Sequence, residues 1–406
     1  MKRLAMVFAV TGWTLWATAC PPGECQTDAD CEGEGKICSA SNTCVEKPGP
    51  IPFQDGGALD QARRDRAVED SGPEDSFGRD LRSRDRPASF DASNPSQVSA
   101  FDVCSGPRAV ALDSNAARVY VACEPSDTIK VYHSVTGVEI ANSELTSLPS
   151  PCRPRALLLL DARSQLWVAC GDSVNTFIYN VDPASGTPHE AGIRYNSIGF
   201  NARFAAGSDR LAWVEATGTA FHLRQVAGTT STWIADVTGL QYGNGVAVTT
   251  TGSAFFTNSN SAAITRSDRN GGLINPAFSA PTVNNQLVAF SASRDVLVVA
   301  SHTGYSRLNA GNGAPIGGAQ SFGAGASVQA LVAQPDGQYA LLSRYNATSS
   351  QDTIDKISMD PGQATPTVSS QTIAGCNAVD LAIAADGRVF IACYNLAEVQ
   401  VRRFGP

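Results

Sequence analysis

Three stretches of this chain are near copies of one another, and each begins and ends with a cysteine. Each contains an alternating apolar run, a polar turn and a second apolar run that ends in Ala-Cys, a pattern that predicts a β-hairpin. Directly opposed residues on antiparallel strands have Cα atoms about 4.5–5.5 Å apart, inside the range that a disulfide tolerates. We therefore expect one disulfide in each hairpin: Cys104–Cys123, Cys152–Cys170 and Cys376–Cys393.

The hairpin recurs along the chain without its cysteines. Seven equivalent starts align: Pro107, Pro154, Asn201, Asn244, Asn285, Val328 and Asn377. Successive starts lie between 41 and 49 residues apart. A period of about 40–50 residues with several short strands in each unit is typical of the blades of a β-propeller. The repeat therefore predicts an all-β, seven-bladed β-propeller over residues 96–406.

The first unit resembles a known propeller repeat. Its sequence, Pro107-RAVALDSNAARVYVA and then Asp127-TIKVYHSVTG, is similar to the YVTN or NHL-type repeat. Asp336-Gly337 and Asp386-Gly387 supply the turn dipeptide of that repeat in the last two units, whereas units three to five match only its hydrophobic alternation. The resemblance implies a ring of blades around a central channel, and a fold of this kind serves many functions.

The last unit needs a strand from elsewhere. It contains a single strand-like run after Cys393, near Glu398. The segment from Gln97 to Val103 is also strand-like and has no partner of its own, so we expect it to complete the seventh blade. Such closure removes the unpaired sheet edges that an open array would expose.

The N-terminal segment has the features of an export signal. Lys2 and Arg3 precede an apolar stretch, residues 4–19, that is too short for a stable membrane span. It ends in Ala17-Thr18-Ala19-Cys20, which resembles the lipobox of bacterial lipoproteins, although that family usually has leucine at the position of Ala17. The resemblance implies removal of residues 1–19, lipidation of Cys20, and anchorage in the bacterial cell envelope, facing the periplasm or the exterior. The alternative is a plain secretory peptide and a spare thiol.

Residues 20–44 form a predicted disulfide-rich module. Its four pairable cysteines are Cys25, Cys31, Cys38 and Cys44. So short a polar stretch cannot bury a core, and two disulfides would have to order it. The module resembles a small cysteine-rich unit found after the anchor of bacterial envelope lipoproteins. Its connectivity stays open among three pairings, and the wide spacing disfavours zinc. Of the chain's 11 cysteines, only Cys20 is left without a partner.

Residues 45–95 predict a disordered linker. They are rich in Gly, Pro, Ser, Asp and Arg and contain few aromatic residues. Burial of so few apolar groups would not offset the entropy cost of ordering the segment. Arginines alternate with acidic residues there, and the formal net charge of the chain is −8. This balance argues against nucleic acid as a partner.

Catalytic motifs are absent from the predicted propeller. It carries four histidines, at His133, His189, His222 and His302, none in a metal-binding motif or at equivalent blade positions. Gly-x-Ser-x-Gly and phosphate-loop signatures are also missing. We therefore expect no cofactor and no metal, and we interpret the histidines as strand or loop residues.

A set of polar residues does recur where the innermost strands begin. The set is Arg108, Arg155, Arg203, Gln286, Gln329 and Asp380. Innermost strands line the channel, so the three arginines predict a cationic arc at one channel mouth that could hold a carboxylate or phosphate. The alternative is that Asp380 pairs with Arg108 while the other arginines bond loop carbonyls.

Two functions fit this sequence. The first is a membrane-anchored, non-enzymatic scaffold, expected to be monomeric, that binds an envelope protein or a small anionic ligand. The second is a propeller hydrolase or lyase acting on a small anionic substrate at the channel mouth. A carboxylate or histidine in the channel beside a metal would favour the enzyme, and a channel lined by Arg, Gln and Ser would favour binding.

Overall fold

The computed structural model describes residues 36–38 and 44–46 and, with gaps, residues 100–404. The gaps are 114–116, 141–144, 146–147, 149–151, 161–162, 172–174, 196–202, 208, 215–219, 228–229, 239–242, 260, 283, 324 and 364–365. The predicted signal peptide, Cys20, Cys25, Cys31 and nearly all of the predicted linker lie outside the described residues. The chain divides into two units, residues 1–83 and 84–406.

In the first unit, two short strands form an antiparallel pair. They are β1 (Lys36–Cys38) and β2 (Cys44–Glu46), and their register places Cys38 opposite Cys44. Two cysteines thus lie directly opposite each other on antiparallel strands, as we expect for the three hairpins that begin and end with cysteine.

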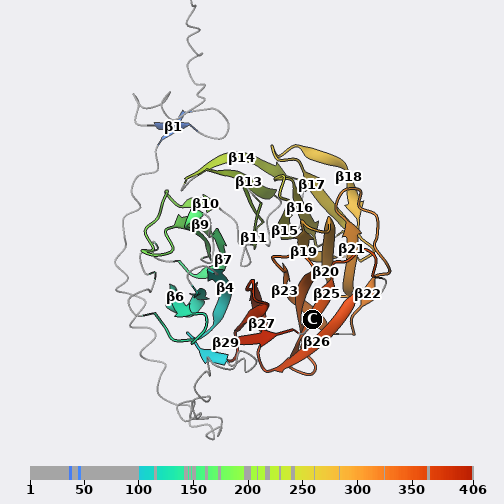
Figure 1. Cartoon of the computed structure of the whole chain (residues 1–406). Coiled ribbons are helices and arrows are strands. Elements are labelled where there is room, and N and C mark those ends of the chain that lie inside the picture. Colours follow the sequence, from blue (N-terminus) through green and yellow to red (C-terminus); the bar gives the residue numbers. More distant parts are fainter. Residues whose placement is uncertain are drawn as a thin grey trace, which may run out of the picture. The chain divides into compact units, whose positions relative to one another are not determined.

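The second unit is a seven-bladed β-propeller, as the repeat predicts, and its blades are arranged in a ring (Figure 1). Blade I contains β4 (Pro107–Asp113), β5 (Arg118–Cys123) and β6 (Thr128–His133). Blade II contains β7 (Pro154–Leu160), β8 (Gln165–Gly171), β9 (Thr176–Val181) and β10 (Ile193–Tyr195). Blade III contains β11 (Arg203–Ala206), β12 (Arg210–Val214), β13 (Ala220–Ala227) and β14 (Thr230–Thr238).

The remaining blades repeat the same order from the channel outward. Blade IV contains β15 (Gly243–Val248), β16 (Ala254–Asn258), β17 (Ala263–Ser267) and β18 (Leu273–Ser279). Blade V contains β19 (Asn285–Ser291), β20 (Val296–Ser301), β21 (Gly304–Asn309) and β22 (Gln320–Ser321). Blade VI contains β23 (Ala326–Ala333), β24 (Tyr339–Asn346), β25 (Gln351–Ser358) and β26 (Thr367–Ala374). Blade VII contains β27 (Ala378–Ile383), β28 (Arg388–Cys393), β29 (Glu398–Arg403) and β3 (Ala100–Asp102).

Strand β3 closes the ring. It pairs with β29, with Phe101 opposite Val399, so the start of the propeller supplies the outer strand of its last blade. The Phe101 ring also lies 5.4 Å from the ring of Tyr132 in blade I. The expected closure is therefore confirmed, with β3 pairing along the outer edge of β29.

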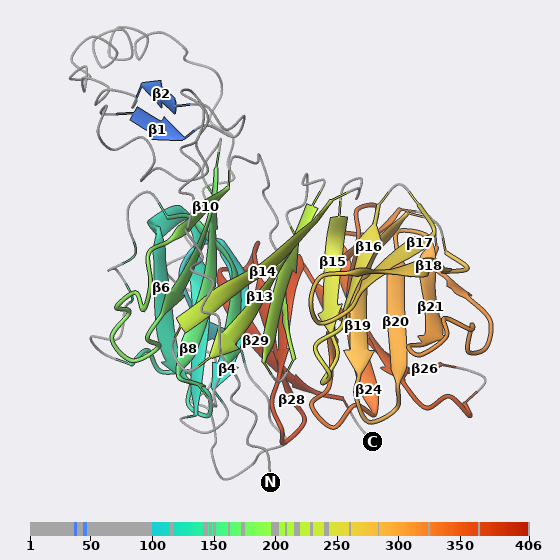
Figure 2. The ribbon, with the colours of Figure 1, turned by 90° about the horizontal axis from the view of Figure 1, so that it is seen from above.

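The apolar core lies between blades. Seven clusters of buried residues among the described ones each combine two neighbouring blades. The second strands are mostly buried and contribute large fully buried side chains, such as Tyr120, Trp167, Trp213 and Phe390. These strands pack on both faces, which explains their near-continuous apolar sequence. Figure 2 shows inner strands such as β15, β16, β19 and β20 running along the axis of the ring, whereas outer strands such as β14 and β18 are tilted away from it.

The three predicted disulfides are present. The Cα atoms lie 5.8 Å apart in Cys104–Cys123, 4.9 Å apart in Cys152–Cys170 and 4.5 Å apart in Cys376–Cys393. In blades I, II and VII, the disulfide joins the segment just before the innermost strand to the end of the second strand of the same blade. All three therefore brace the same face of the ring.

A β-bulge shapes the start of most innermost strands. In six blades the register between the first and second strands shifts near the first residues, for example between Pro107 and Ala109 in blade I. In blade III the described pairing of β11 with β12 has no shift. A bulge adds one residue that the partner strand does not match and redirects its side chain. It therefore determines which side chains share a level of the channel.

Candidate functional site

The predicted polar set occupies two levels of the channel. Arg108, Arg155, Gln286 and Gln329 are the extra residues of their bulges. In blade VII that position belongs to Val379. Asp380 instead pairs with Ala392, and Arg203 pairs with Val214, one step further along their strands. Their register therefore differs from that of the other four residues, of which Arg155 still lines the same cavity in the channel as Arg203 and Asp380.

At the outer level, one carboxylate holds two arginines. Glu124, in the 3₁₀ turn η3 (Glu124–Ser126), accepts a hydrogen bond from Nη2 of Arg155 at 2.6 Å and another from Nε of Arg108. The Arg108 guanidinium also lies 4.3 Å from the ring centroid of Tyr394 in blade VII. Burial lowers the pKa of Arg155, and the charge of Glu124 opposes that effect.

In the predicted cationic arc, Arg108 and Arg155 are both paired with one carboxylate. Arg108 pairs with Glu124, so the alternative in which it pairs with Asp380 is wrong. Glu124 follows Cys123 directly, and the Cys104–Cys123 disulfide fixes the strand end that carries it. The sequence signal for Glu124 was its position at a braced strand end, but nothing in the sequence indicated that it would face two arginines from different blades.

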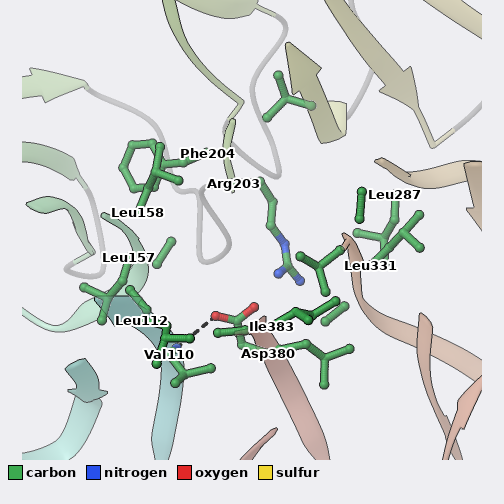
Figure 3. A pocket seen from close by; sticks show the side chains of 18 of the residues that line it. Val110, Leu112, Leu157, Leu158, Arg203, Phe204, Leu287, Leu331, Asp380 and Ile383 are labelled. Atoms are coloured by element: carbon green, nitrogen blue, oxygen red, sulfur yellow. Dashed lines mark hydrogen bonds between the residues drawn. The ribbon is translucent and has the colours of Figure 1, made fainter. Parts of the chain in front are cut away.

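At the inner level, Arg203 and Asp380 face each other across the channel (Figure 3). The Arg203 side chain extends from blade III and donates a 2.6 Å hydrogen bond from Nη2 to the backbone carbonyl of Gln329 in blade VI. Asp380 accepts a 3.0 Å hydrogen bond from the backbone N–H of Val110 in blade I. Each side chain therefore connects its blade to another.

The surroundings disfavour both charges. Burial raises the pKa of Asp380, while the positive charge of Arg203 and the N–H groups of Val110 and Leu381 oppose that rise. Burial likewise lowers the pKa of Arg203, and Asp380 opposes that change. Both side chains keep part of their surface accessible, and both line the channel cavity. A perturbed ionisable pair in a cavity is a common mark of a functional site.

The channel cavity has polar as well as apolar surface. Its volume is about 350 Å³, and all seven blades contribute to its lining. Aliphatic side chains dominate, among them Leu112, Leu157, Leu158, Leu287, Leu331 and Ile383. Figure 3 shows leucines from blades I and II on one side of the pair and leucines from blades V and VI on the other. Two of the predicted arginines, Arg155 and Arg203, line this cavity, and the residues that follow them along the innermost strands are mostly aliphatic.

The two glutamines act locally. The Gln286 side chain contacts Nε2 of His302, and Nε2 of Gln329 donates to Oγ of Ser327 at 3.1 Å. Gln329 reaches the site only through its backbone carbonyl, the acceptor of Arg203. That role depends on strand position and could not be inferred from the residue type.

The other histidines have local partners too. His133 accepts from the N–H of Val135, and Nε2 of His189 lies 3.2 Å from a backbone carbonyl. His222 contacts Asp236 in blade III, and burial lowers its pKa. Among the described residues, no group of three His, Cys, Asp or Glu side chains could hold a metal ion. Nor does that part of the chain contain a helix with the length and apolar character to cross a bilayer.

Comparisons with known proteins extend the description of the fold. No family model and no curated protein sequence matches the chain. Among solved structures, 1344 chains match, so the fold does not identify one activity. A chain in the crystal structure of the mitotic checkpoint complex is 16% identical, with a TM-score of 0.55, over 82% of this chain and 98% of that one. The β-propeller domain of Cps50 (Swd1) from Myceliophteria thermophila is 10% identical, with a TM-score of 0.57, over 74% and 98%.

Proposed function

We propose that this chain is a lipid-anchored protein of the bacterial cell envelope and that its propeller is a monomeric, non-enzymatic binding module. The anchor is supported by the Ala17-Thr18-Ala19-Cys20 sequence after an apolar stretch. A single acyl chain binds membranes only marginally, so the multiply acylated cysteine of bacterial lipoproteins is the form that the proposal requires. The linker would hold the propeller roughly 40 Å from the membrane if it behaves as a flexible coil.

The binding role rests on one observation in the channel. The Arg203 guanidinium lies opposite a carboxylate in a cavity of about 350 Å³ whose lining residues are mostly aliphatic, and it is hydrogen-bonded to a strand from another blade. Small-molecule sites have this character, since they are mostly apolar and contain a few convergent polar groups. The disulfides and the ring of inter-blade bonds keep the blades in register, and such preorganisation lowers the entropy cost of binding. The ligand in this proposal is small and carries an anionic group for Arg203.

Two measurements test the proposal. Membrane fractionation of cells that express Cys20→Ser should find the protein released or unprocessed, whereas wild type stays with the membrane. A thermal-shift screen of small metabolites should give ligands that raise the melting temperature of wild type but not of Leu331→Phe, which fills the cavity. Unchanged fractionation contradicts the anchor, and a screen without any cavity-dependent ligand contradicts the binding role.

A propeller hydrolase or lyase remains a second candidate because of Asp380. A carboxylic acid with a raised pKa can donate a proton as a general acid, and burial raises the pKa of Asp380. The two functions separate on the fate of the ligand. Proton NMR of a ligand from the screen, recorded before and after incubation with the protein, should show it unchanged under our proposal and converted under the alternative.

A further inference from the structure

The inner level of the channel contains two opposite charges that do not neutralise each other directly. Arg203 and Asp380 interact electrostatically, but in the part of the chain that the structure describes they form neither a hydrogen bond nor a direct ion pair. Burying a charge is costly unless it is paired and hydrogen-bonded. A molecule bound between the two side chains could therefore pair with both charges.

Both groups have unused hydrogen-bonding capacity. A guanidinium has five N–H donors, and among the described residues only the Gln329 carbonyl accepts from Arg203. A carboxylate has about four acceptor sites, of which Asp380 uses two, for the N–H groups of Val110 and Leu381. The unused donors and acceptors belong to side chains that line the same cavity.

The rest of the cavity limits the size and polarity of the occupant. Its volume of about 350 Å³ lies near the lower end of the range for small-molecule sites, roughly 300–1,000 Å³. Leucine and isoleucine side chains from opposite blades border the charged pair on both sides, as Figure 3 shows. A matching molecule is small, has an apolar part, and presents a negative and a positive group close together.

We propose that the channel binds a zwitterionic α-amino acid with an apolar side chain. Its carboxylate would take the free donors of Arg203, its ammonium group would donate to Asp380, and its side chain would lie among the leucines. The inference rests on the proposed function in one respect, that the channel is the binding site. It goes further by naming the chemical class of the ligand.

Charge balance favours a zwitterion over simpler ions. A monocarboxylate would satisfy Arg203 but place a second negative charge beside Asp380, and an amine would do the converse. A neutral apolar molecule would leave both charged groups without new partners in a low-dielectric site. A free amino acid satisfies both groups without changing the net charge of the cavity.

Titration calorimetry on the full chain in detergent tests the ligand class. The probes are L-leucine, 4-methylpentanoate, which lacks the ammonium group, 3-methylbutan-1-amine, which lacks the carboxylate, and glycine, which lacks the apolar side chain. We expect L-leucine to bind at least about tenfold more tightly than each of the other three, the scale of one lost charged hydrogen bond or a lost aliphatic contact.

Variants locate the site. Arg203→Gln and Asp380→Asn should each weaken L-leucine binding about tenfold or more. Arg108→Gln is the matched control, because Arg108 lies at the outer level and does not line the cavity, and it should leave L-leucine affinity unchanged. Leu331→Phe retains both charges and should still weaken binding by reducing the space. Melting curves identify any variant that fails to fold, and the four probes on wild type test the proposal without variants.

The outcomes are distinct. Equal affinity for 4-methylpentanoate and L-leucine, or equal weakening by Arg108→Gln and Arg203→Gln, would overturn the zwitterion proposal. Absence of L-leucine binding would also overturn it, while a cavity-dependent ligand of another class in the thermal screen would leave the proposed binding function standing. Without any such ligand, both proposals fail.

Discussion

The Asp380 carboxylate accepts a hydrogen bond from the backbone N–H of Val110 at 3.0 Å, across 270 residues of sequence. The bond joins the innermost strand of the last blade to that of the first. The same carboxylate stands opposite Arg203 in the channel. Asp380 therefore links closure of the ring to the electrostatics of the candidate site, and its protonation should affect both.

Replacing Asp380 with asparagine should change how stability depends on pH. Burial raises the pKa of Asp380, so the folded state binds its proton more tightly than the unfolded chain does. The free energy of unfolding should therefore fall as the pH rises from the pKa of Asp380 in the unfolded chain to its higher pKa in the folded protein. Asparagine stays neutral and can still accept from Val110.

We therefore expect the melting temperature of Asp380→Asn minus that of wild type to increase as the pH rises through that interval. Differential scanning calorimetry at a series of pH values measures the difference. Arg203 is the charged group that faces Asp380, and its own charge does not change in this range. A difference that is constant, or that falls with rising pH, contradicts the assigned direction of the shift.

Replacing Glu124 with glutamine should destabilise the outer level of the channel. Glu124 is the carboxylate shared by Arg108 and Arg155, and the Arg155 side chain is only 10% exposed. Removing the negative charge takes the Glu124 carboxylate away from a mostly buried guanidinium, at a cost of about 1–3 kcal/mol in unfolding free energy.

Arg108→Gln is the control, because Arg108 is 33% exposed and its loss leaves the pair of Glu124 with Arg155 intact, at a cost of about 1 kcal/mol. Urea unfolding measures both variants. We also expect phosphate to raise the melting temperature of Glu124→Gln more than that of wild type, since an anion can replace the lost carboxylate. Equal unfolding free energies for the two variants would show that Glu124 is not the shared counter-charge.

Closure by β3 should contribute measurably to stability. Phe101 pairs with Val399 and packs against the ring of Tyr132, so Phe101→Ala removes a half-buried contact between the seventh and first blades. We expect a loss of about 1–3 kcal/mol. Val138→Ala, at a side chain that is 64% exposed, should change stability by less than about 0.5 kcal/mol. Chemical denaturation that ranks Val138→Ala as the more damaging change would refute this account of closure.

The disulfides should be intramolecular and confined to single blades. Peptide mapping without reduction should recover Cys104 with Cys123, Cys152 with Cys170, and Cys376 with Cys393. Replacing both Cys376 and Cys393 with serine should cost about 3 kcal/mol, the chain-entropy value for a loop of roughly 15 residues. Recovery of any of these cysteines with a partner in another blade would contradict the register.

The architecture could be predicted from the sequence because it depends on local pattern. The predicted repeat starts lie within two residues of the first residues of the seven innermost strands, such as Asn201 against Arg203 and Val328 against Ala326. Alternating apolar residues specify hairpins, and the hairpins repeat at one period. The paired cysteines then follow from hairpin register, which explains why all three pairs were correct.

The candidate site could be predicted only in part because it depends on register details. Arg203 and Asp380 were selected together with Arg108, but Arg108 is the extra residue of a bulge, whereas Arg203 and Asp380 are paired residues one level deeper in the channel. A bulge leaves little trace in an alternating pattern, since it adds a single residue. Glu124 was missed as a partner because its contacts come from blades I and II at once.

A crystal structure of the protein grown with L-leucine tests the central claim most directly. The account predicts electron density for the amino acid in the channel, with its carboxylate against the Arg203 guanidinium, its ammonium group against Asp380, and its side chain among Leu157, Leu287 and Leu331. A channel that contains only water under saturating L-leucine, or L-leucine bound outside the channel, would contradict it.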